Sequence, residues 1–560
     1  MLNRTKLIND TIYKHIECSE FESLILQTKI VNRLFFVTQN ALAYFAYPSI
    51  NTKRYIHSLG TMHISGHMFK NAILNANEQV KYTFLKKIKK SIKLIIKENK
   101  LDLTIKDIDN LSDKTLYEFM IPLKSNNFKD IYLITLQALR IVGLLHDVGH
   151  FPFSHQVEYA MEKLYDILHE NKTHNKREKE FLNFYETITK NSTFVLHEAI
   201  GEKLVDLLFE HEMQQFGTNK KDKNYIKLIY LMVKNILSEK DDGIFDYKVL
   251  HTFIDGTVDA DRLDYINRDM LASGYIGGSI DFIRIAKRAI LVENKKEFKI
   301  SFFDSELIDI EHMIEMRFNL YKKIIYNHKI SIIDSLLENV ILYQAKKYLK
   351  STDEDKDDTQ TNSISMLWKF LDENNSEKKL DIISQLDENW IITLFKKEYF
   401  SLKYKENYNF KDKKYLSSFE EILFGKKFYN SAWRNLNDLY NLLNFTDIQR
   451  YKFRESFGYV SKNNYKKLQI CLEKLCKKYE KIDNETFYTY RIVSLNIGID
   501  KNFSLFDGDE LIKIDQVSTL RKRLKKSILN TVPFYIFSNK QKLNNNMKSE
   551  IKDILYDVFL

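Results

Sequence analysis

Residues 131–147 (IYLITLQALRIVGLLHD) form an almost wholly apolar run. A helix that is apolar on every side must be buried, so we expect one at the centre of the fold. Gly149 and Pro152 are stop signals just after His146 and Asp147. Polar side chains at the end of a buried helix are costly unless something compensates them. The run therefore predicts the centre of the core and a polar site at its end.

The rest of the chain is poor in the residues that make turns. It has 15 Gly and 4 Pro in 560 residues, well below the usual ~7% and ~5%. A hydrophobic fraction of 44% is enough for a large core, and the length exceeds that of one ordinary domain. We therefore expect a mainly α fold with a large lobe and at least one appended lobe.

Apolar residues at helical spacing locate the other expected helices. They cover 20–47, 54–67, 79–100, 195–240, 303–350 and 364–480. The end of the chain changes character. Residues 487–498 and 530–538 are rich in β-branched and aromatic residues and predict strands, with a helix over 515–529 between them. This pattern indicates a small C-terminal α+β lobe.

The expected domain boundaries follow these changes. Residues 351–363 (STDEDKDDTQTNS) are acidic, polar and without periodicity, which is typical of a linker. We therefore divide the chain into a main domain (1–345), a helical region after the acidic linker (346–482) and the C-terminal α+β lobe (483–560).

Charge and cysteine content narrow the class of protein. The formal net charge is +10, from 86 basic and 76 acidic residues, which suits an anionic ligand such as a nucleotide and also nonspecific contact with nucleic acid. Cys18, Cys471 and Cys476 are too few for a structural zinc site. The N-terminus has no long apolar h-region, and no apolar run reaches 18 residues. We expect a cytoplasmic protein without a membrane span.

Four residues have the chemistry of a metal site: His57, His146, Asp147 and Asp261. Imidazole nitrogens and carboxylate oxygens bind divalent Fe, Mn, Co, Ni, Zn or Mg. Such a set leaves positions open for water and a phosphate oxygen, and the metal would lower the pKa of the water. A His-Asp dipeptide alone is weak support, but here it follows a buried helix and precedes a further HxxxxH spacing, His150 to His155.

Six stretches in order give a specific resemblance. They are LINDTIYKHIE (7–17), the segment ending RLFFVTQ (33–39), RYIHSLG (54–60), GLLHDVGHFPFSH (143–155), DADRLDYINRD (259–269) and the run from Arg317 to Lys329. Together they resemble the HD superfamily, and within it the deoxynucleoside triphosphate (dNTP) triphosphohydrolases. The likeness covers about 1–345, which it implies is an HD-type catalytic domain. A Lys-rich insertion lies at about 74–130.

The resemblance implies roles for named residues. It places the metal on His57, His146, Asp147 and Asp261. The catalytic residues would be His150, His155, His197 and Glu158, where the family has Asp in place of Glu158. Substrate contacts would come from Gln39, Asn40, Arg54, Arg262, Tyr265, Asp269, Arg317 and Tyr326. Gln39 matches a contact to the sugar 3′-hydroxyl, whereas Asn40 replaces an apolar residue, and the run that holds Tyr326 is one residue longer than its counterpart.

The resemblance also implies a nucleotide effector bound between subunits, and hence a homo-oligomer, dimer or tetramer. Lys6 and Asn9 match parts of that regulatory site, but Gln27, Asn32 and Phe35 do not match the positions that read guanine. The Lys-rich insertion is either a solvated helical excursion or a surface for a partner, nucleic acid or another subunit. The basic stretch 521–526 (RKRLKK) has the same two interpretations.

The expected activity is metal-dependent hydrolysis of dNTPs to deoxynucleoside and inorganic triphosphate, in nucleotide-pool control or in depletion of dNTPs against phage. A histidine would protonate the departing 5′-oxygen. One alternative is an HD phosphodiesterase or nuclease that acts on oligonucleotides or cyclic nucleotides, which would show ligands for a second ion or an open groove. Another is a nucleotide-sensing or nucleic-acid-binding module without turnover.

Overall fold

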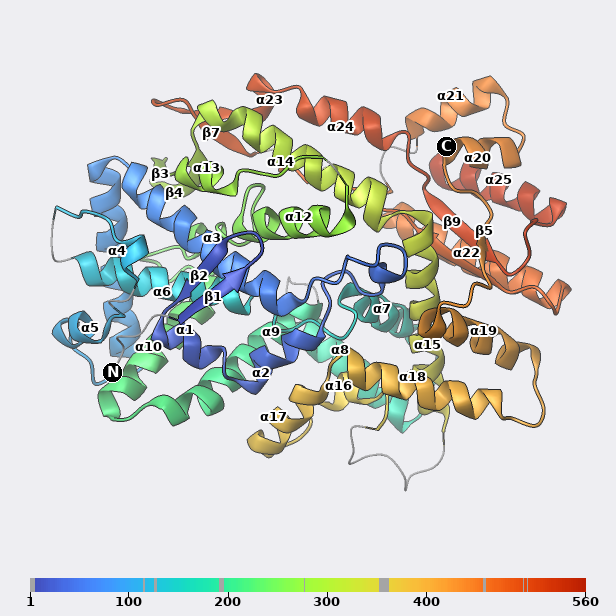
Figure 1. The fold of residues 1–560 in the computed structure, drawn as a ribbon, viewed down its shortest axis with the longest axis horizontal. Coiled ribbons are helices and arrows are strands. Elements are labelled where there is room, and N and C mark those ends of the chain that lie inside the picture. Colours follow the sequence, from blue (N-terminus) through green and yellow to red (C-terminus); the bar gives the residue numbers. More distant parts are fainter. Residues whose placement is uncertain are drawn as a thin grey trace.

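The computed structural model of the chain describes residues 6–113, 116–124, 128–190, 196–275, 277–351, 362–456, 460–496, 498–500 and 502–560. These residues form a mainly helical protein, as predicted (Figure 1). The expected linker 351–363 lies almost wholly outside the described residues. Within the described part, no helix is both long enough and apolar enough to cross a bilayer.

Three helices form the centre of the molecule: α3 (Arg54–Asn75), α6 (Lys129–Leu145) and α12 (Ala260–Ser273). All residues of α6 from Ile131 to its end are buried, which confirms the prediction from its apolar run. Because α6 is apolar all round, α3 covers one of its sides and α10 (Lys220–Leu237) another, while α12 packs on α3. The His-Asp dipeptide that ends α6 therefore lies in the interior.

Amphipathic helices surround this centre. The Lys-rich helix predicted over 79–100 is α4 (Glu78–Glu98), which buries Phe84, Ile88 and Ile92 and leaves lysines outside. The segment 20–47 holds two short helices and two 3-10 turns instead of a long helix. The other helices of the main domain are α1 (Glu20–Ile25), α2 (Lys29–Asn32), α5 (Ile105–Leu111), α7 (His155–His169), α8 (Lys176–Lys190), α9 (Leu196–Leu207), α11 (Lys248–His251), α13 (Phe282–Lys287), α14 (Leu307–Asn319) and α15 (His328–Lys350).

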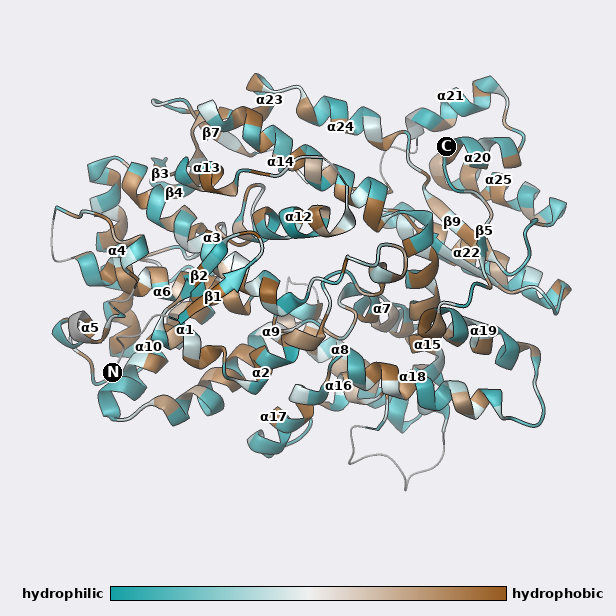
Figure 2. Cartoon of the chain, in the orientation of Figure 1, coloured by the Kyte–Doolittle hydropathy of each residue, from teal (hydrophilic) through white to brown (hydrophobic). Residues whose placement is uncertain are grey.

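The long helix α15 runs beside the C-terminal sheet, which lies on the right in Figure 1, whereas the segment 504–528 lies along the top. Figure 2 shows many apolar residues along α15. The helices beyond it are α16 (Met366–Lys369), α17 (Ser376–Gln385), α18 (Glu388–Lys403), α19 (Phe410–Phe424), α20 (Leu436–Leu442), α21 (Asp447–Ser456), α22 (Lys462–Ile482) and α25 (Asn545–Phe559).

The C-terminal sheet has the order β5-β9-β6, with antiparallel pairing. Strands β6 (Tyr488–Ile492) and β9 (Phe534–Ser538) lie within the two predicted strand segments. The helix predicted over 515–529 is divided into α23 (Ile514–Val517) and α24 (Leu520–Ile528). Strand β5 (Asn430–Ser431) comes from the region predicted to be helical, so the sheet joins two of the predicted regions.

Three hairpins were not predicted. The first pairs β1 (Lys6–Asp10) with β2 (Lys14–Cys18), the second pairs β3 (Ala289–Asn294) with β4 (Glu297–Phe302), and the third pairs β7 (Ser504–Phe506) with β8 (Leu511–Lys513). Their strands are three to six residues long, so alternation of apolar and polar residues is too short to detect.

Candidate active site

The four residues predicted to bind metal converge from three elements. His57 lies in the first turn of α3, His146 and Asp147 directly follow α6, and Asp261 lies in the first turn of α12. The Nε2 atom of His57 is 2.9 Å from Asp261 Oδ1 and 3.4 Å from Asp147 Oδ2. The Nε2 atom of His146 is 3.5 Å from Asp261 Oδ1. The fold thus brings together residues separated by up to 204 positions of sequence.

This donor set fits a divalent metal. The Nε2 atoms of His57 and His146 are buried and make no hydrogen bond, although carboxylate oxygens lie close to both. Their Nδ1 atoms are held from behind, by Asp264 Oδ2 at 2.8 Å and by the Gly143 carbonyl oxygen at 2.8 Å. Two imidazole nitrogens that face the same carboxylates without bonding to them are arranged as ligands around a common centre.

The negative charge of the carboxylates determines the protonation of His57 in the metal-free site. Burial works against the charged form of His57, but Asp261 and Asp264 outweigh it and raise the pKa of His57 to about 10. Burial would likewise raise the pKa of Asp147, yet Arg54 and the neighbouring histidines hold it well below its usual range. Arg54 forms a buried ion pair with Asp147. A cation that binds here must displace protons from the histidines, so its affinity rises with pH.

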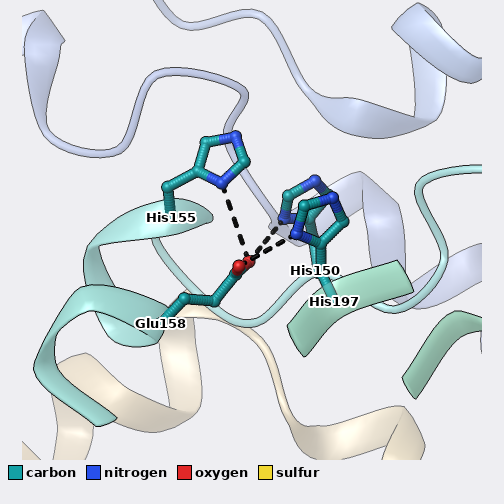
Figure 3. A group of neighbouring side chains, drawn as sticks. All are labelled: His150, His155, Glu158 and His197. Carbon is teal, nitrogen blue, oxygen red and sulfur yellow. Dashed lines mark hydrogen bonds and ion pairs between the residues drawn. The ribbon is translucent and has the colours of Figure 1, made fainter. Parts of the chain in front are cut away.

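A second cluster, which we call the Glu158 cluster, contains His150, His155, His197 and Glu158 (Figure 3). His150 lies in the loop after α6, His155 and Glu158 in the first turn of α7, and His197 in α9. Glu158 Oε1 is 3.1 Å from His150 Nδ1, and Oε2 is 2.9 Å from His197 Nδ1. His155 Nδ1 is 3.8 Å from Glu158 Oε1. The longer side chain of Glu158 therefore reaches all three histidines.

Burial and charge set the protonation of this cluster. Burial, helped by Arg54 and His197, lowers the pKa of His150 to about 3. Burial opposes ionisation of Glu158, but His197 and the hydrogen bonds to the histidines hold its pKa well below the usual range. Glu158 is therefore a carboxylate and His150 a neutral imidazole at physiological pH. The side chain of His155 is 50% exposed, against 11% for His197 and 1% for His150.

The two clusters adjoin. His150 Nε2 is 3.2 Å from Asp147 Oδ1, so one imidazole faces both. The turn between them is strained, because Phe153 and Ser154 have φ angles of 60° and 52°, in the left-handed region that non-glycine residues rarely adopt. Arg54 Nε donates to Ser154 Oγ at 2.8 Å, and the Ser154 hydroxyl donates to the Thr38 carbonyl oxygen at 2.6 Å. These bonds hold the turn that starts α7.

Both clusters open into one cavity of about 330 Å³. Its wall includes the predicted contacts Gln39, Asn40, Arg54, Tyr265 and Asp269. Five acidic or histidine residues that the sequence analysis did not single out also line it: Glu198, Glu202, Glu239, His251 and Asp255. Glu198 and Glu202 follow His197 on the same helix, α9, by one residue and by about one and a half turns. Their spacing from His197 could have identified them from the sequence.

Three predicted substrate contacts lie outside the cavity wall. Arg262 donates to the carbonyl oxygens of Gly498 (2.9 Å) and Thr257 (3.1 Å), and Arg317 Nε donates to the Tyr265 hydroxyl at 3.1 Å. Both arginines therefore sit behind Tyr265, against the C-terminal lobe. The Tyr326 hydroxyl donates to the Ser494 carbonyl oxygen at 3.2 Å.

The run 317–329, which is one residue longer than its counterpart in the family that it resembles, contains a π-helix. Residues Leu320–Ile325 are a π-helix, which accommodates one more residue than an α-helix of the same length. Tyr321 and Ile325 line the cavity, whereas Tyr326 is not part of its wall.

The residues predicted to bind an effector lie elsewhere. Lys6 and Asn9 are in β1, and Asn9 Oδ1 is 3.0 Å from His15 Nδ1 on the paired strand. Neither belongs to the described wall of the cavity.

Comparisons with known proteins show what the chain resembles. No family model matches the chain. It is 22% identical over 71% of its length to an uncharacterised protein of Methanocaldococcus jannaschii. It is 22% identical over 64% to a Dictyostelium discoideum protein named deoxynucleoside triphosphate triphosphohydrolase SAMHD1 homolog, and 23% identical over 62% to human deoxynucleoside triphosphate triphosphohydrolase SAMHD1. The matched regions cover 65%, 53% and 46% of those proteins.

A solved structure shares the fold. The chain superimposes on a phosphohydrolase from Bacteroides thetaiotaomicron with a TM-score of 0.54 and 16% sequence identity, over 96% of this chain and all of the other. The predicted resemblance to dNTP triphosphohydrolases is therefore confirmed as a likeness in sequence, with a phosphohydrolase as a match in fold.

Proposed function

We propose that the chain is a metal-dependent phosphohydrolase that converts dNTPs to deoxynucleoside and inorganic triphosphate. The observation that carries the proposal is the single cavity in which the His57–His146–Asp147–Asp261 set adjoins the Glu158 cluster. The names of two relatives support the choice of dNTPs as substrate.

The division of labour follows from exposure and charge. A divalent metal on His57, His146, Asp147 and Asp261 would polarise a phosphate oxygen and lower the pKa of water. His155 is the one histidine of the Glu158 cluster that is half exposed to the cavity, so it can reach a substrate. As water attacks the α-phosphorus, the P–O5′ bond breaks, and His155 donates a proton to the departing 5′-oxygen. Glu158 orients the histidines and stabilises the imidazolium.

Charge orients the substrate in the cavity. A triphosphate is polyanionic, and Arg54 lies on the metal side of the wall, where a guanidinium can pair with phosphate oxygens. The carboxylates of Glu198, Glu202 and Asp255 would repel bare phosphates. We therefore place the phosphates toward Arg54 and the metal ligands, and we expect counter-cations of the nucleotide near the carboxylates.

Several parts of the proposal concern the assembled protein. A homo-oligomer, a nucleotide effector near Lys6 and Asn9, and a role in dNTP-pool control or antiphage depletion remain predictions. Control of the dNTP pool and antiphage depletion both depend on lowering the dNTP concentration.

The test is product analysis. Purified protein is incubated with each dNTP in the presence of Mn²⁺, Fe²⁺, Co²⁺ or Mg²⁺, and the products are separated by chromatography. A His146→Ala protein purified in parallel controls for contaminating phosphatases. We expect deoxynucleoside and triphosphate in equal amounts. Release of orthophosphate or pyrophosphate would place the attack on another phosphorus and contradict the proposal.

One observation favours a second candidate. The ligand atoms of His150, His155, His197 and Glu158 lie within 4.8 Å of one another, which also fits a metal ion. Two adjoining metal sites are typical of enzymes that cleave phosphodiesters. An HD phosphodiesterase or nuclease would bind two ions per chain and cleave oligonucleotides or cyclic nucleotides. Elemental analysis gives the number of ions per chain, and product analysis with oligonucleotides and cyclic nucleotides shows whether they are cleaved. Together these measurements separate the two functions. Binding of dNTPs without any product would indicate a nucleotide sensor.

A further inference from the structure

The N-terminal hairpin β1–β2 presents one aromatic residue to the interior. Asp10 Oδ1 accepts hydrogen bonds from the backbone N–H groups of Ile12 (2.8 Å) and Tyr13 (2.9 Å), which fixes the turn. The Tyr13 ring then packs edge-on against Phe282 at 4.6 Å and beside His63 at 5.1 Å, measured between ring centroids. These contacts hold the ring and leave its hydroxyl at one defined position.

That position is the carboxylate behind a predicted metal ligand. The Tyr13 hydroxyl donates to Asp264 Oδ1 at 2.6 Å, and the other oxygen, Oδ2, is 2.8 Å from His57 Nδ1. Asp264 and His57 are both fully buried. One carboxylate thus joins the hairpin to the imidazole.

Arg268 closes the network. Its Nε donates to both oxygens of Asp264, at 2.9 Å and 2.8 Å, and its NH1 is 2.9 Å from Asp10 Oδ2. The guanidinium also lies over the Tyr13 ring, 5.3 Å from its centroid. Asp10, which fixes the turn, and Asp264, which contacts His57, therefore both bind the guanidinium of Arg268. A buried carboxylate with so many partners has one orientation.

At Gly60, the backbone of α3 lies very close to the side chains of Asp264 and Arg268. A Cβ atom on Gly60 would lie 1.7 Å from Asp264 Oδ1 and 2.9 Å from Arg268 NH2. Any larger residue would push the carboxylate away from His57. The contact of α12 with α3 is therefore built around Asp264.

We propose that the N-terminal hairpin is part of the metal centre and that Tyr13 is a positioning residue, which holds His57 through Asp264 with Nε2 directed at the metal. The inference rests on the metal binding that the proposed function requires. A carboxylate hydrogen-bonded to the Nδ1–H of a metal-binding histidine fixes the tautomer and the ring orientation. Tyr13 and Arg268 in turn fix the carboxylate, Arg268 from the same helix, α12, and Tyr13 from the turn of the hairpin.

The test is metal affinity of the full chain. Tyr13→Phe keeps the ring contacts and removes only the hydroxyl. Protein stripped with a chelator is titrated with Co²⁺, and the visible absorption of the bound ion gives both the affinity and the ligand geometry. Loss of an outer partner of a ligand typically weakens binding by ~10–100-fold. We expect about 10-fold for Tyr13→Phe, with a changed absorption spectrum, and a larger loss for Asp264→Asn.

A matched control is Tyr479→Phe, which removes a tyrosine–carboxylate hydrogen bond of 2.7 Å, to Glu550, in the C-terminal half. It should match the wild type in Co²⁺ affinity and spectrum. If Tyr13→Phe also matches the wild type in both, the inference is wrong, whatever its melting temperature. If wild-type protein binds Co²⁺ but hydrolyses no dNTP, the proposed substrate fails and the inference stands. If it binds no Co²⁺, both fail.

Discussion

His150 and His197 stack with their ring centroids 3.8 Å apart, and each directs Nδ1 to a different oxygen of Glu158. Parallel imidazoles at this distance repel each other when both are charged. The buried ring, His150, is therefore neutral, with a pKa lowered to about 3 by burial, Arg54 and His197. One carboxylate thus fixes two rings while the half-exposed His155 stays free to face the cavity.

Glu158→Gln should slow turnover with little change in KM. The amide keeps the size of the side chain but has only one acceptor oxygen, so it cannot accept from both His150 and His197. We expect kcat to fall by about 10-fold, less than for loss of a general acid. Steady-state hydrolysis of a dNTP measures this. Glu158→Asp, which keeps the charge, should retain more activity than Glu158→Gln, and the opposite order would contradict the role of the charge.

His155→Ala should remove the proton donor. General acid–base groups contribute ~10²–10⁴-fold to the rate, and we expect kcat to fall within that range. Because half of the His155 side chain is exposed, the melting temperature and metal content should stay close to those of the wild type. His169→Ala, at the other end of α7, is the control. Wild-type activity, or inactivity explained by unfolding, would take His155 out of the mechanism.

His146→Ala should abolish turnover and lower the content of transition metal. The Nε2 atom of His146 is buried and without a hydrogen bond, so His146→Ala removes a ligand at the cost of one hydrogen bond of the metal-free protein, from Nδ1 to the Gly143 carbonyl oxygen. Asp147→Ala would be harder to interpret, since it leaves the buried Arg54 without its ion pair, at a cost of about 3–5 kcal/mol. Elemental analysis checks the metal. A fully occupied His146→Ala protein would refute the assignment.

The sequence predicted what depends on local pattern. The apolar run of α6, its stop signals and the His-Asp dipeptide were enough to place His146 and Asp147 at the end of a buried helix. The ordered motifs then located His57 and Asp261, which meet that dipeptide. Metal ligation requires particular residue types, so motifs along the sequence are enough to identify these positions.

Contacts between distant segments could not be predicted. Tyr13, in the turn of the hairpin β1–β2, donates a hydrogen bond to Asp264, which is 251 residues away. Arg262 and Arg317 were expected to face phosphate, but carbonyl oxygens of the C-terminal lobe lie beside them. The π-helix at Leu320–Ile325 changes which side chains face the cavity. Each outcome depends on packing between elements, and residue types along the chain do not encode it locally.

Asp269 should give the stability a pH dependence. Burial raises the pKa of Asp269 to about 6, although hydrogen bonding from Asn40 opposes the shift. The unfolded value is ~3.9, so the folded protein binds the extra proton between these pH values. The stabilisation is fully present below pH ~4 and is lost as the pH rises through about 6, a total of about 3 kcal/mol.

Asp269→Asn removes this titration. Relative to the metal-free wild type, the free energy of unfolding of the variant should rise by up to about 3 kcal/mol between pH 4 and pH 7. Urea denaturation at several pH values measures it. A difference that stays constant across this range would mean that Asp269 does not titrate in the folded protein as expected.

The last prediction concerns the arginines behind Tyr265. Gly498 has a φ of +79°, and a Cβ there would lie 2.2 Å from Arg317 NH1. Gly498→Ala should therefore displace the guanidinium, in addition to the cost of a left-handed alanine, about 1 kcal/mol. If Arg317 contributes to phosphate binding, loss of a charge-assisted contact of about 1.5 kcal/mol raises KM for a dNTP roughly 10-fold. Gly243→Ala provides the control, because Gly243 has a φ of +77° and its Cβ would meet nothing within 4 Å. Both variants should lose similar backbone stability, measured by urea denaturation, while only Gly498→Ala changes KM. Equal KM values would show that Arg317 does not bind the substrate.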